Sequence, residues 1–262
     1  MCSIKNNTKI KSKWPKYFVT FFLFFCISKA NAGKNLNIYA EANLAPAIVK
    51  IAKIFSTENN VVTSVNFDSS IDFVENLNNG DSFNVFVSAN VNTIESLKQK
   101  GLIDVYNIIY IASDRLLLVC KKENMLPINM IPDKINIGDA IKIIDEYKLN
   151  LIINHENTSE GFYSQKLIDS SNFNNLKLFI KLQEDRSSLI KDIEDNNDSF
   201  GLIFASQLKN NKTLRIIASD QEKSYQAMAV AGNDMEIARQ FLKFLKSDIA
   251  EKIFSSYGLS NN

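Results

Sequence analysis

Histidine, glycine and cysteine are all scarce in this 262-residue chain, and their scarcity excludes several kinds of site. His155 is the single histidine, so the chain has few bases for a Ser–His–Asp triad. The sequence contains no Gly-x-Ser-x-Gly elbow, no His-Glu-x-x-His helix and no Gly-x4-Gly-Lys phosphate loop. A hydrolase is therefore poorly supported, and we expect no enzymatic activity.

A strong charge of either sign is also lacking, since the formal net charge is +1. That excess includes a basic N-terminus, so the remainder is slightly acidic, and no basic stripe indicates nucleic-acid binding. Of the three cysteines, Cys2 and Cys26 lie in the N-terminal segment, and Cys26 lacks the context of a lipoprotein box. Cys120 then remains alone, which excludes an internal disulfide and a thiolate metal site. Because it ends the apolar run 116–120, we expect a buried thiol.

The N-terminus has the pattern of a secretory signal peptide. Lysines cluster in residues 9–16, an apolar run of 11 residues follows at 17–27, and Ala30-Asn31-Ala32 supplies small residues for cleavage. We predict a cleavable signal over residues 1–32 and a periplasmic mature protein. An N-terminal membrane anchor is the alternative, although a span needs about 20 apolar residues.

Strand and helix patterns alternate along the rest of the chain. Leu36–Ala40 has the period-two pattern of a strand, and Leu44–Phe55 has a helical stripe with Asn43 placed as its N-cap. Further strands are expected at 61–67, 84–88, 116–121, 149–153, 176–182, 199–204, 214–218 and 225–231, and helices at 69–79, 93–100, 136–144, 161–170, 187–194, 234–244 and 247–257.

This alternation predicts an α/β fold with mostly parallel sheets flanked by helices. Two such blocks and a C-terminal return indicate two lobes. We expect lobe 1 to contain residues 33–114 and 225–262, and lobe 2 residues 115–224, with crossings near Leu116 and Tyr225.

Ligands of open α/β sheets bind where strands end and helices begin. The cleft between the lobes should therefore be lined by five strand-to-helix junctions: Ala40–Leu44, Phe67–Ile71, Asn154–Gly161, Glu184–Ser188 and Phe204–Gln207.

Several segments carry a resemblance to a known family through their order and spacing: Tyr39–Leu44, Phe67–Ser70, Asp81–Ala89, Gly161–Leu167, Phe200–Ser206 and Ala250–Leu259. Together they resemble the periplasmic molybdate-binding proteins of bacterial ABC importers, over nearly all of the mature chain. Tyr39–Leu44, for example, is similar to that family's aromatic-Ala-Ala-Ala-Ser-Leu segment.

The resemblance implies a solute-binding component that holds a tetrahedral oxyanion, molybdate or tungstate, in the interlobe cleft. It implies a membrane permease as partner, a monomer, no cofactor, no metal site and no nucleic acid. Backbone N–H groups at helix N-termini and hydroxyls would satisfy the oxygens of the anion. The positions that match the family's ligand contacts are Asn43, Ser70, Glu160, Arg186 and Phe204.

Four of these positions depart from the family pattern. Phe204 replaces a tyrosine and has no hydroxyl, whereas Asn43 replaces a serine and can donate through its amide. Glu160 and Arg186 stand at positions that act through the backbone, so their donors survive substitution.

Carboxylates near the expected cleft alter its charge. Glu41, Asp68 and Glu160 add three acids against one new base, Arg186. A like-charge contact at about 4 Å costs about 4 kcal/mol at an effective dielectric of about 20. The same fold could therefore bind a cation or a small organic solute, or bind its anion only weakly.

Each candidate residue also has a purely structural explanation. Ser70 and Asn43 are good helix caps, and acids are favoured at helix starts. Arg186 could pair with Asp185 or Glu184, Phe204 could belong to the core, and a lone loop histidine such as His155 is more often incidental than a metal ligand.

Overall fold

The computed structural model describes residues 35–68, 70–78, 82–123, 135–170, 180–219, 225–232 and 236–260. The chain divides into two units, Met1–Ala32 and Gly33–Asn262, and every described residue belongs to the second. The predicted signal peptide lies outside the described residues.

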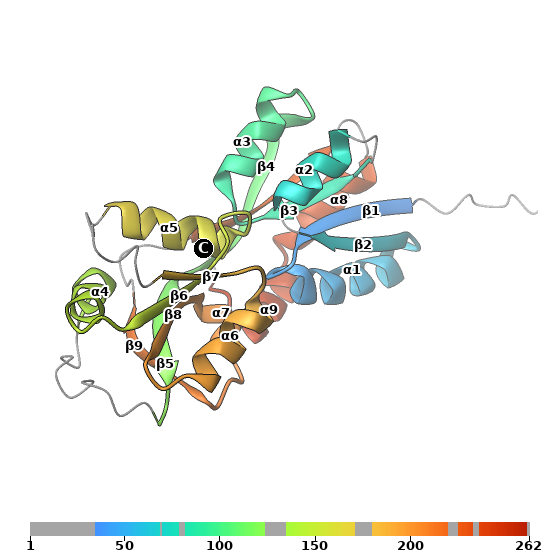
Figure 1. The fold of residues 1–262 in the computed structure, drawn as a ribbon. Coiled ribbons are helices and arrows are strands. Elements are labelled where there is room, and N and C mark those ends of the chain that lie inside the picture. The colour runs from blue at the N-terminus through green and yellow to red at the C-terminus, as the bar shows by residue number, and fades with distance from the viewer. Residues whose placement is uncertain are drawn as a thin grey trace, which may run out of the picture. The chain divides into compact units, whose positions relative to one another are not determined.

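The first five-stranded sheet has the strand order β2-β1-β3-β10-β4 (Figure 1). Strands β2, β1 and β3 are parallel, whereas β10 is antiparallel to both β3 and β4. We call this sheet and its helices lobe 1. The strands are β1 Asn35–Glu41, β2 Val62–Asp68, β3 Val85–Ser88, β4 Ile103–Asp114 and β10 Tyr225–Gly232, and the helices are α1 Ala45–Asn59, α2 Ser70–Asn78, α3 Val91–Gln99, α8 Glu236–Leu245 and α9 Asp248–Ser256.

The second five-stranded sheet repeats this plan with the order β7-β6-β8-β5-β9. Strands β7, β6 and β8 are parallel, and β5 is antiparallel to β8 and β9. We call this sheet and its helices lobe 2. The strands are β5 Leu116–Lys121, β6 Asn150–Asn154, β7 Ile180–Gln183, β8 Ser199–Phe204 and β9 Leu214–Ser219, and the helices are α4 Ile137–Glu146, α5 Ser159–Ser170, α6 Arg186–Asp195 and α7 Ala205–Leu208.

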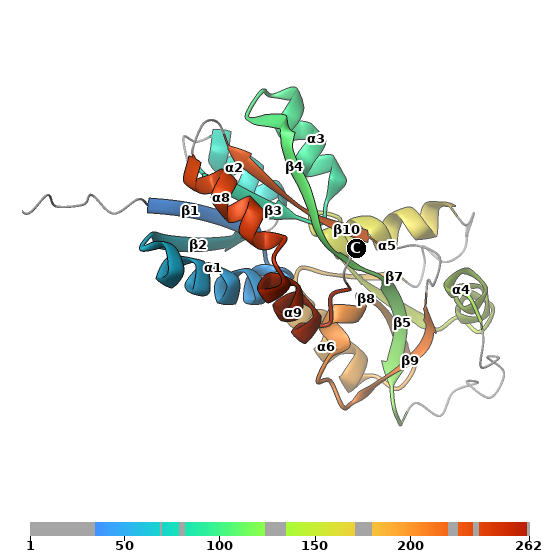
Figure 2. The same ribbon diagram turned by 180° about the vertical axis from the view of Figure 1, so that it is seen from behind.

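The chain passes between the lobes at two places. Strand β4 runs into β5 with only Arg115 between them, as Figure 2 shows. The return lies between β9 and β10, where residues 220–224 are outside the described part of the chain. The two-lobed α/β prediction is thus confirmed, while parallel pairing is confined to one half of each sheet because the strands at the crossings run antiparallel to their neighbours.

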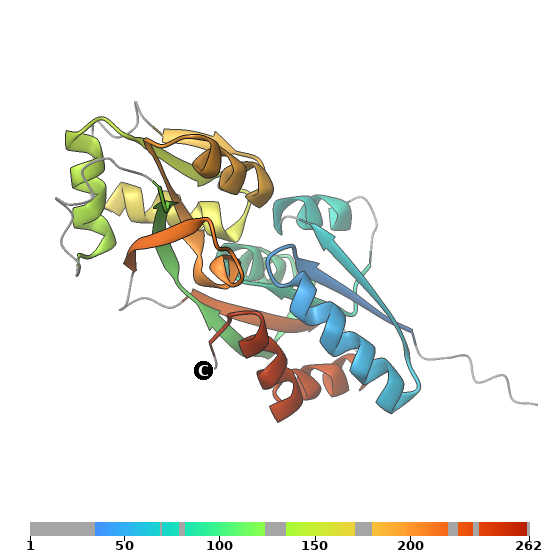
Figure 3. The ribbon, with the colours of Figure 1, turned by 90° about the horizontal axis from the view of Figure 1, so that it is seen from below.

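The core of lobe 1 forms where α1 packs beside α8 and α9 (Figure 3). The apolar stripe of α1 is buried, and the Phe55 ring meets the Phe241 ring edge-on with centroids 5.1 Å apart. Pro46 is tolerated because it falls in the first turn, where its missing N–H has no intrahelical partner.

The core of lobe 2 is built on β5, whose first five residues are all buried. The stripe of α4 packs in the same cluster through Ile137, Ala140, Ile141 and Ile144. Cys120 is fully buried in it, which confirms the prediction of a buried thiol.

Three local expectations differ from the structure. The helix cap prediction for Asn43 was wrong, because the N-cap of α1 is Leu44 and the backbone turns at residues 42–44. Strand β4 was not predicted. The strand expected at 176–182 is observed as Ile180–Gln183, and residues 171–179 lie outside the described part.

Within the described residues, no helix has the length and apolar character needed to cross a membrane.

Replacing Phe55 by alanine should lower the free energy of unfolding by about 3–5 kcal/mol, since it leaves a cavity between α1 and α8. The matched control in the same helix is Val49→Ala, because Val49 is 46% exposed and should change stability by less than about 0.5 kcal/mol. Urea unfolding followed by circular dichroism measures both, and equal losses in the two variants would contradict this account of the core.

Candidate functional site

A pocket of about 450 Å³ lies where strand ends and helix starts of both lobes meet. Lobe 1 contributes the end of β1, the turn after it, and the end of β2; lobe 2 contributes the starts of α5 and α6 and one residue of α7. The pocket is lined by Glu41, Ala42, Asn43, Phe67, Asn154, Asn157, Thr158, Ser159, Glu160, Glu184, Asp185, Arg186 and Gln207. Every one of these residues falls within the five junctions predicted from the sequence.

The N-terminus of α5 supplies backbone donors at this pocket, because the first N–H groups of a helix have no intrahelical acceptor. The Ser159 N–H donates to the Glu41 carboxylate at 2.8 Å, and the Gly161 N–H donates to Thr158 Oγ1 at 3.1 Å. Among the described residues, no acceptor is found for the Glu160 N–H between them. This N–H is therefore unpaired among the described residues, at a residue that lines the pocket.

The start of α5 is held unusually close to the end of β6. A Cβ atom on Gly161 would lie 2.1 Å from the His155 carbonyl oxygen and 2.4 Å from that of Asn154. Only glycine permits this contact, which places the first turn of α5 directly over the end of the strand.

The N-terminus of α6 opens into the same pocket. Its N-cap Asp185 accepts from the Ser188 N–H at 2.9 Å and from Ser188 Oγ at 3.0 Å. These two bonds lower the pKa of Asp185 below its ordinary value. Asp185 therefore stays ionised and caps the helix. Arg186 is the positively charged residue at this end of the pocket.

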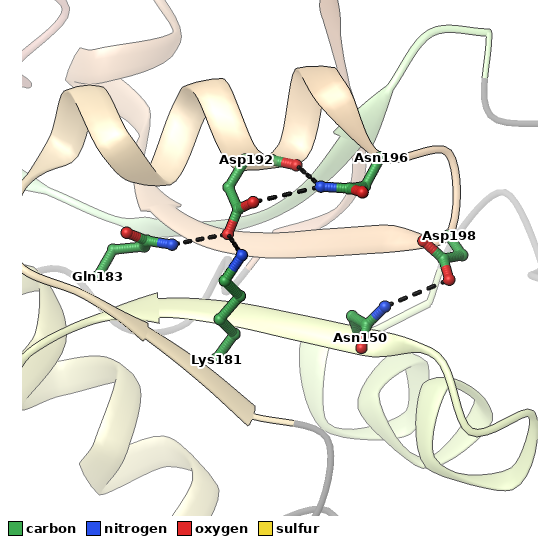
Figure 4. A network of polar contacts seen from close by, with 6 residues as sticks. All are labelled: Asn150, Lys181, Gln183, Asp192, Asn196 and Asp198. Atoms are coloured by element: carbon green, nitrogen blue, oxygen red, sulfur yellow. Dashed lines mark hydrogen bonds and ion pairs between the residues drawn. The ribbon is translucent and has the colours of Figure 1, made fainter.

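A polar network holds α6 against the edge strand β7 (Figure 4). Asp192 accepts from Gln183 Nε2 and from Lys181 Nζ, each at 2.6 Å, and Asn196 donates to it at 3.2 Å. This network fixes the β7–α6 pair and hence the pocket junction between them.

The Arg186 side chain is exposed and lies along the pocket rim. Its Nη2 donates to the Gln207 carbonyl oxygen at 3.0 Å. Over the described residues, no ion pair of Arg186 with Asp185 or Glu184 is found. Its charge also acts on the buried Glu160 carboxyl, where it lowers the pKa.

Glu41 is 4% exposed and connects the lobes. Its Oε2 accepts from Ser88 Oγ at 3.0 Å and from the Ala89 N–H at 2.9 Å, both in lobe 1. Its two carboxylate oxygens also accept from the N–H and the hydroxyl of Ser159 in lobe 2.

Glu160 is 3% exposed and points away from the α5 axis toward β8. Its Oε1 accepts from the Phe204 N–H at 2.6 Å and its Oε2 from Asn154 Nδ2 at 2.5 Å. Burial raises the pKa of Glu160 from 4.5 to about 8, against the opposing effects of the Phe204 N–H and Arg186. At neutral pH this carboxyl is therefore mostly protonated and adds little negative charge.

Asp114 is a second buried acid close by, at the crossing from β4 to β5. Its Oδ1 accepts from the Arg115 N–H at 2.8 Å and from the Ser206 N–H at 3.2 Å. Burial raises the pKa of Asp114, and its charge in turn raises that of Glu160. The Asp114 charge thus favours the neutral form of Glu160.

Three of the five predicted ligand positions, Asn43, Glu160 and Arg186, line the pocket. Ser70 begins α2, but its side chain lies outside the described part, as does that of Asp68. The Phe204 ring is fully buried in the lobe 2 core, and only its N–H reaches the site, through Glu160.

Sequence reasoning named the right junctions but missed several residues within them. Asn154, Asn157 and Gln207 line the pocket and, with Asn43, each have a buried amide oxygen without a hydrogen-bond partner in the described chain. Phe67 is 63% exposed at the end of β2 and adds an aromatic ring to the lining. The available signal was only their position within the strand-to-helix junctions.

His155 lies beside the pocket, and its Nδ1 is buried without a described partner. Among the described residues, no three acidic, histidine or cysteine side chains are placed to share a metal ion.

Two lobes of this topology, joined by two crossings around a pocket of helix N-termini, define the class of two-lobed solute-binding proteins. The sequence profile of the family described as "Bacterial extracellular solute-binding protein" matches residues 36–260, and the chain belongs to this family.

Similar proteins bear names of anion binders. The molybdate-binding protein ModA of Haemophilus influenzae is 23% identical over 239 residues, covering 87% of this chain and 91% of the relative. The tungstate ABC transporter structure from Geobacter sulfurreducens has a TM-score of 0.70 at 15% identity, covering 85% of this chain and 98% of that one. PEB3 of Campylobacter jejuni, solved with L-phospholactate bound, has a TM-score of 0.62 at 17% identity, covering 87% and 100%.

Replacing Gly161 by alanine should lower the free energy of unfolding by about 1–3 kcal/mol, because the new methyl group would collide with two backbone oxygens. Gly138→Ala is the matched control: it lies in the first turn of α4, and its nearest neighbour, Asn136 Oδ1, is 3.4 Å away. Thermal or urea unfolding compares the two. A loss in the control as large as that in Gly161→Ala would show that the close approach is not the cause.

Glu160 should make the stability depend on pH. Between its ordinary pKa of 4.5 and its folded pKa of about 8, the folded protein holds a proton that the unfolded chain has released. The contribution of this group is therefore fully present below the lower value and is lost as the pH rises through the upper one. Glu160→Gln keeps the shape without titrating, so urea unfolding across this range should show a smaller decline with pH in the variant. Parallel declines would contradict the raised pKa.

Proposed function

We propose that this chain is the extracytoplasmic solute-binding component of an ABC importer and that it captures a small anion in the pocket between its lobes. The observation that carries the proposal is the convergence of the α5 and α6 N-termini, with Arg186, on one pocket. Each helix N-terminus carries about half a positive charge and unpaired N–H groups, a combination that favours oxyanions.

The anion would be held mainly by the backbone of lobe 2. The Glu160 N–H and the Arg186 N–H at the start of α6 are the donors, and the Arg186 guanidinium adds charge at the rim. Asn43 faces them from lobe 1, and Ser70 would act from the start of α2. Phe204 contributes indirectly, because its N–H holds the Glu160 carboxyl in a buried position.

Molybdate or tungstate is the ligand that the named relatives support, with no cofactor involved. In this proposal the protein is exported through a cleavable signal over residues 1–32 and acts as a periplasmic monomer. It delivers the anion to a membrane permease and catalyses no reaction. The lobes would comprise residues 33–114 with 225–262, and 115–224.

A second candidate is a small organic solute or a cation, and the acceptor groups of the site favour it. Glu41 lies against the pocket, and the four unpaired amide oxygens of Asn43, Asn154, Asn157 and Gln207 need donors. Native mass spectrometry of the purified protein distinguishes the two by the mass of the copurified ligand.

Isothermal titration with molybdate, tungstate, sulfate and phosphate should give saturable heat for at least one of these anions. No heat with any of them would remove the anion proposal, and millimolar dissociation constants would indicate a family member with weak binding.

Arg186→Ala should weaken binding of that anion about tenfold, since a charge-assisted hydrogen bond contributes about 1.5 kcal/mol. Arg239→Ala in α8 is the control, because Arg239 pairs with Glu236 and does not line the pocket. Titration of both variants checks this. Equal affinities of the two would show that Arg186 does not contact the ligand.

A further inference from the structure

Glu41 links the two lobes through hydrogen bonds that are all buried. Its carboxylate receives a hydroxyl and an N–H from the end of β3, and an N–H and a hydroxyl from Ser159 at the start of α5. Ser159 is 118 residues away in sequence and belongs to the other lobe. All four residues involved are buried, so solvent does not compete for these bonds.

A second buried hydrogen bond joins the same parts of the two lobes. Tyr163, one turn further along α5, donates its hydroxyl to the Ala89 carbonyl oxygen at 3.0 Å. The first turns of α5 are therefore joined to the end of β3 twice, directly through Tyr163 and indirectly through the Glu41 carboxylate.

The donors that Glu41 takes are of the kind a captured anion would use. A carboxylate is itself an oxyanion, and the N-terminus of a helix stabilises it as it would a ligand. With the Ser159 N–H and hydroxyl engaged, the free Glu160 N–H is the donor that α5 leaves open among its first residues. A ligand of high negative charge at that donor would also face the Glu41 charge.

We propose that Glu41 is a specificity-determining residue that competes with the ligand for donors. Its carboxylate holds α5 against lobe 1 through Ser159, a link that we call the clasp. An anion gains the Ser159 donors only by displacing this carboxylate. The site thereby discriminates against anions of high charge. The predicted effect of Glu41 on affinity rests on the proposed function, the capture of an anion. The clasp between the lobes rests only on the observed hydrogen bonds.

The experiment compares Glu41→Ala and Glu41→Gln with the unchanged protein. The alanine variant frees the Ser159 donors, and the glutamine variant removes the charge while keeping the size. Glu156→Gln is the charge-matched control, because Glu156 is exposed in the loop before α5 and does not line the pocket. Titration with molybdate, tungstate, sulfate and phosphate gives the affinities.

The expected result is an increase in affinity for the doubly charged anions of about tenfold or more in both Glu41 variants, with no change in Glu156→Gln. Unchanged or weaker affinity in the Glu41 variants, or an equal gain in the control, overturns the competition.

Small-angle scattering of the ligand-free proteins tests the clasp independently. Glu41→Ala should show a larger radius of gyration than the unchanged protein, because its lobes have lost their buried bridge, and Glu156→Gln should not. An unchanged radius overturns the clasp. If no anion binds to any variant, the anion function fails, while the scattering result still decides whether Glu41 holds the lobes.

Discussion

The site depends on how closely the first turn of α5 lies over the end of β6. Because residue 161 is a glycine, the helix start can lie within van der Waals reach of the carbonyl groups of Asn154 and His155 at the end of β6. That contact fixes the Ser159 donors where Glu41 reaches them from the other lobe, and it turns the Glu160 side chain toward the buried end of β8. If the helix were displaced by the width of a methyl group, the hydrogen bonds of Glu41 with Ser159 and of Glu160 with Phe204 would both be lost.

The number of acids around the pocket overstates its negative charge, which favours the proposed capture of an anion. Counted from the sequence, Glu41 and Glu160 each add a negative charge. In the structure, burial keeps Glu160 mostly protonated at neutral pH, and Glu41 is compensated by four donors. The pocket is therefore less negative than composition suggests, while at the α6 end the ionised Asp185 offsets part of the Arg186 charge.

Much of this arrangement was predictable from local patterns. Helical stripes and strand periodicity placed most elements, and the predicted strand-to-helix junctions contain every residue that lines the pocket, although Asn154, Asn157 and Gln207 were not singled out. Strand β4 was missed, although it extends from Ile103 to Asp114. The roles of Glu41 and Glu160 could not be predicted, because they depend on partners far away in sequence and on burial that only the packed lobes create.

The position of β10 has a consequence for the order in which the chain acquires its structure. This strand is inserted between β3 and β4, yet it comes from residues 225–232, after all of the second sheet. Until those residues are available, β3 and β4 each present an unpaired edge, which is a template for wrong pairing. The second sheet uses only strands between residues 116 and 219, so it can assemble first while the N-terminal half waits for the end of the chain.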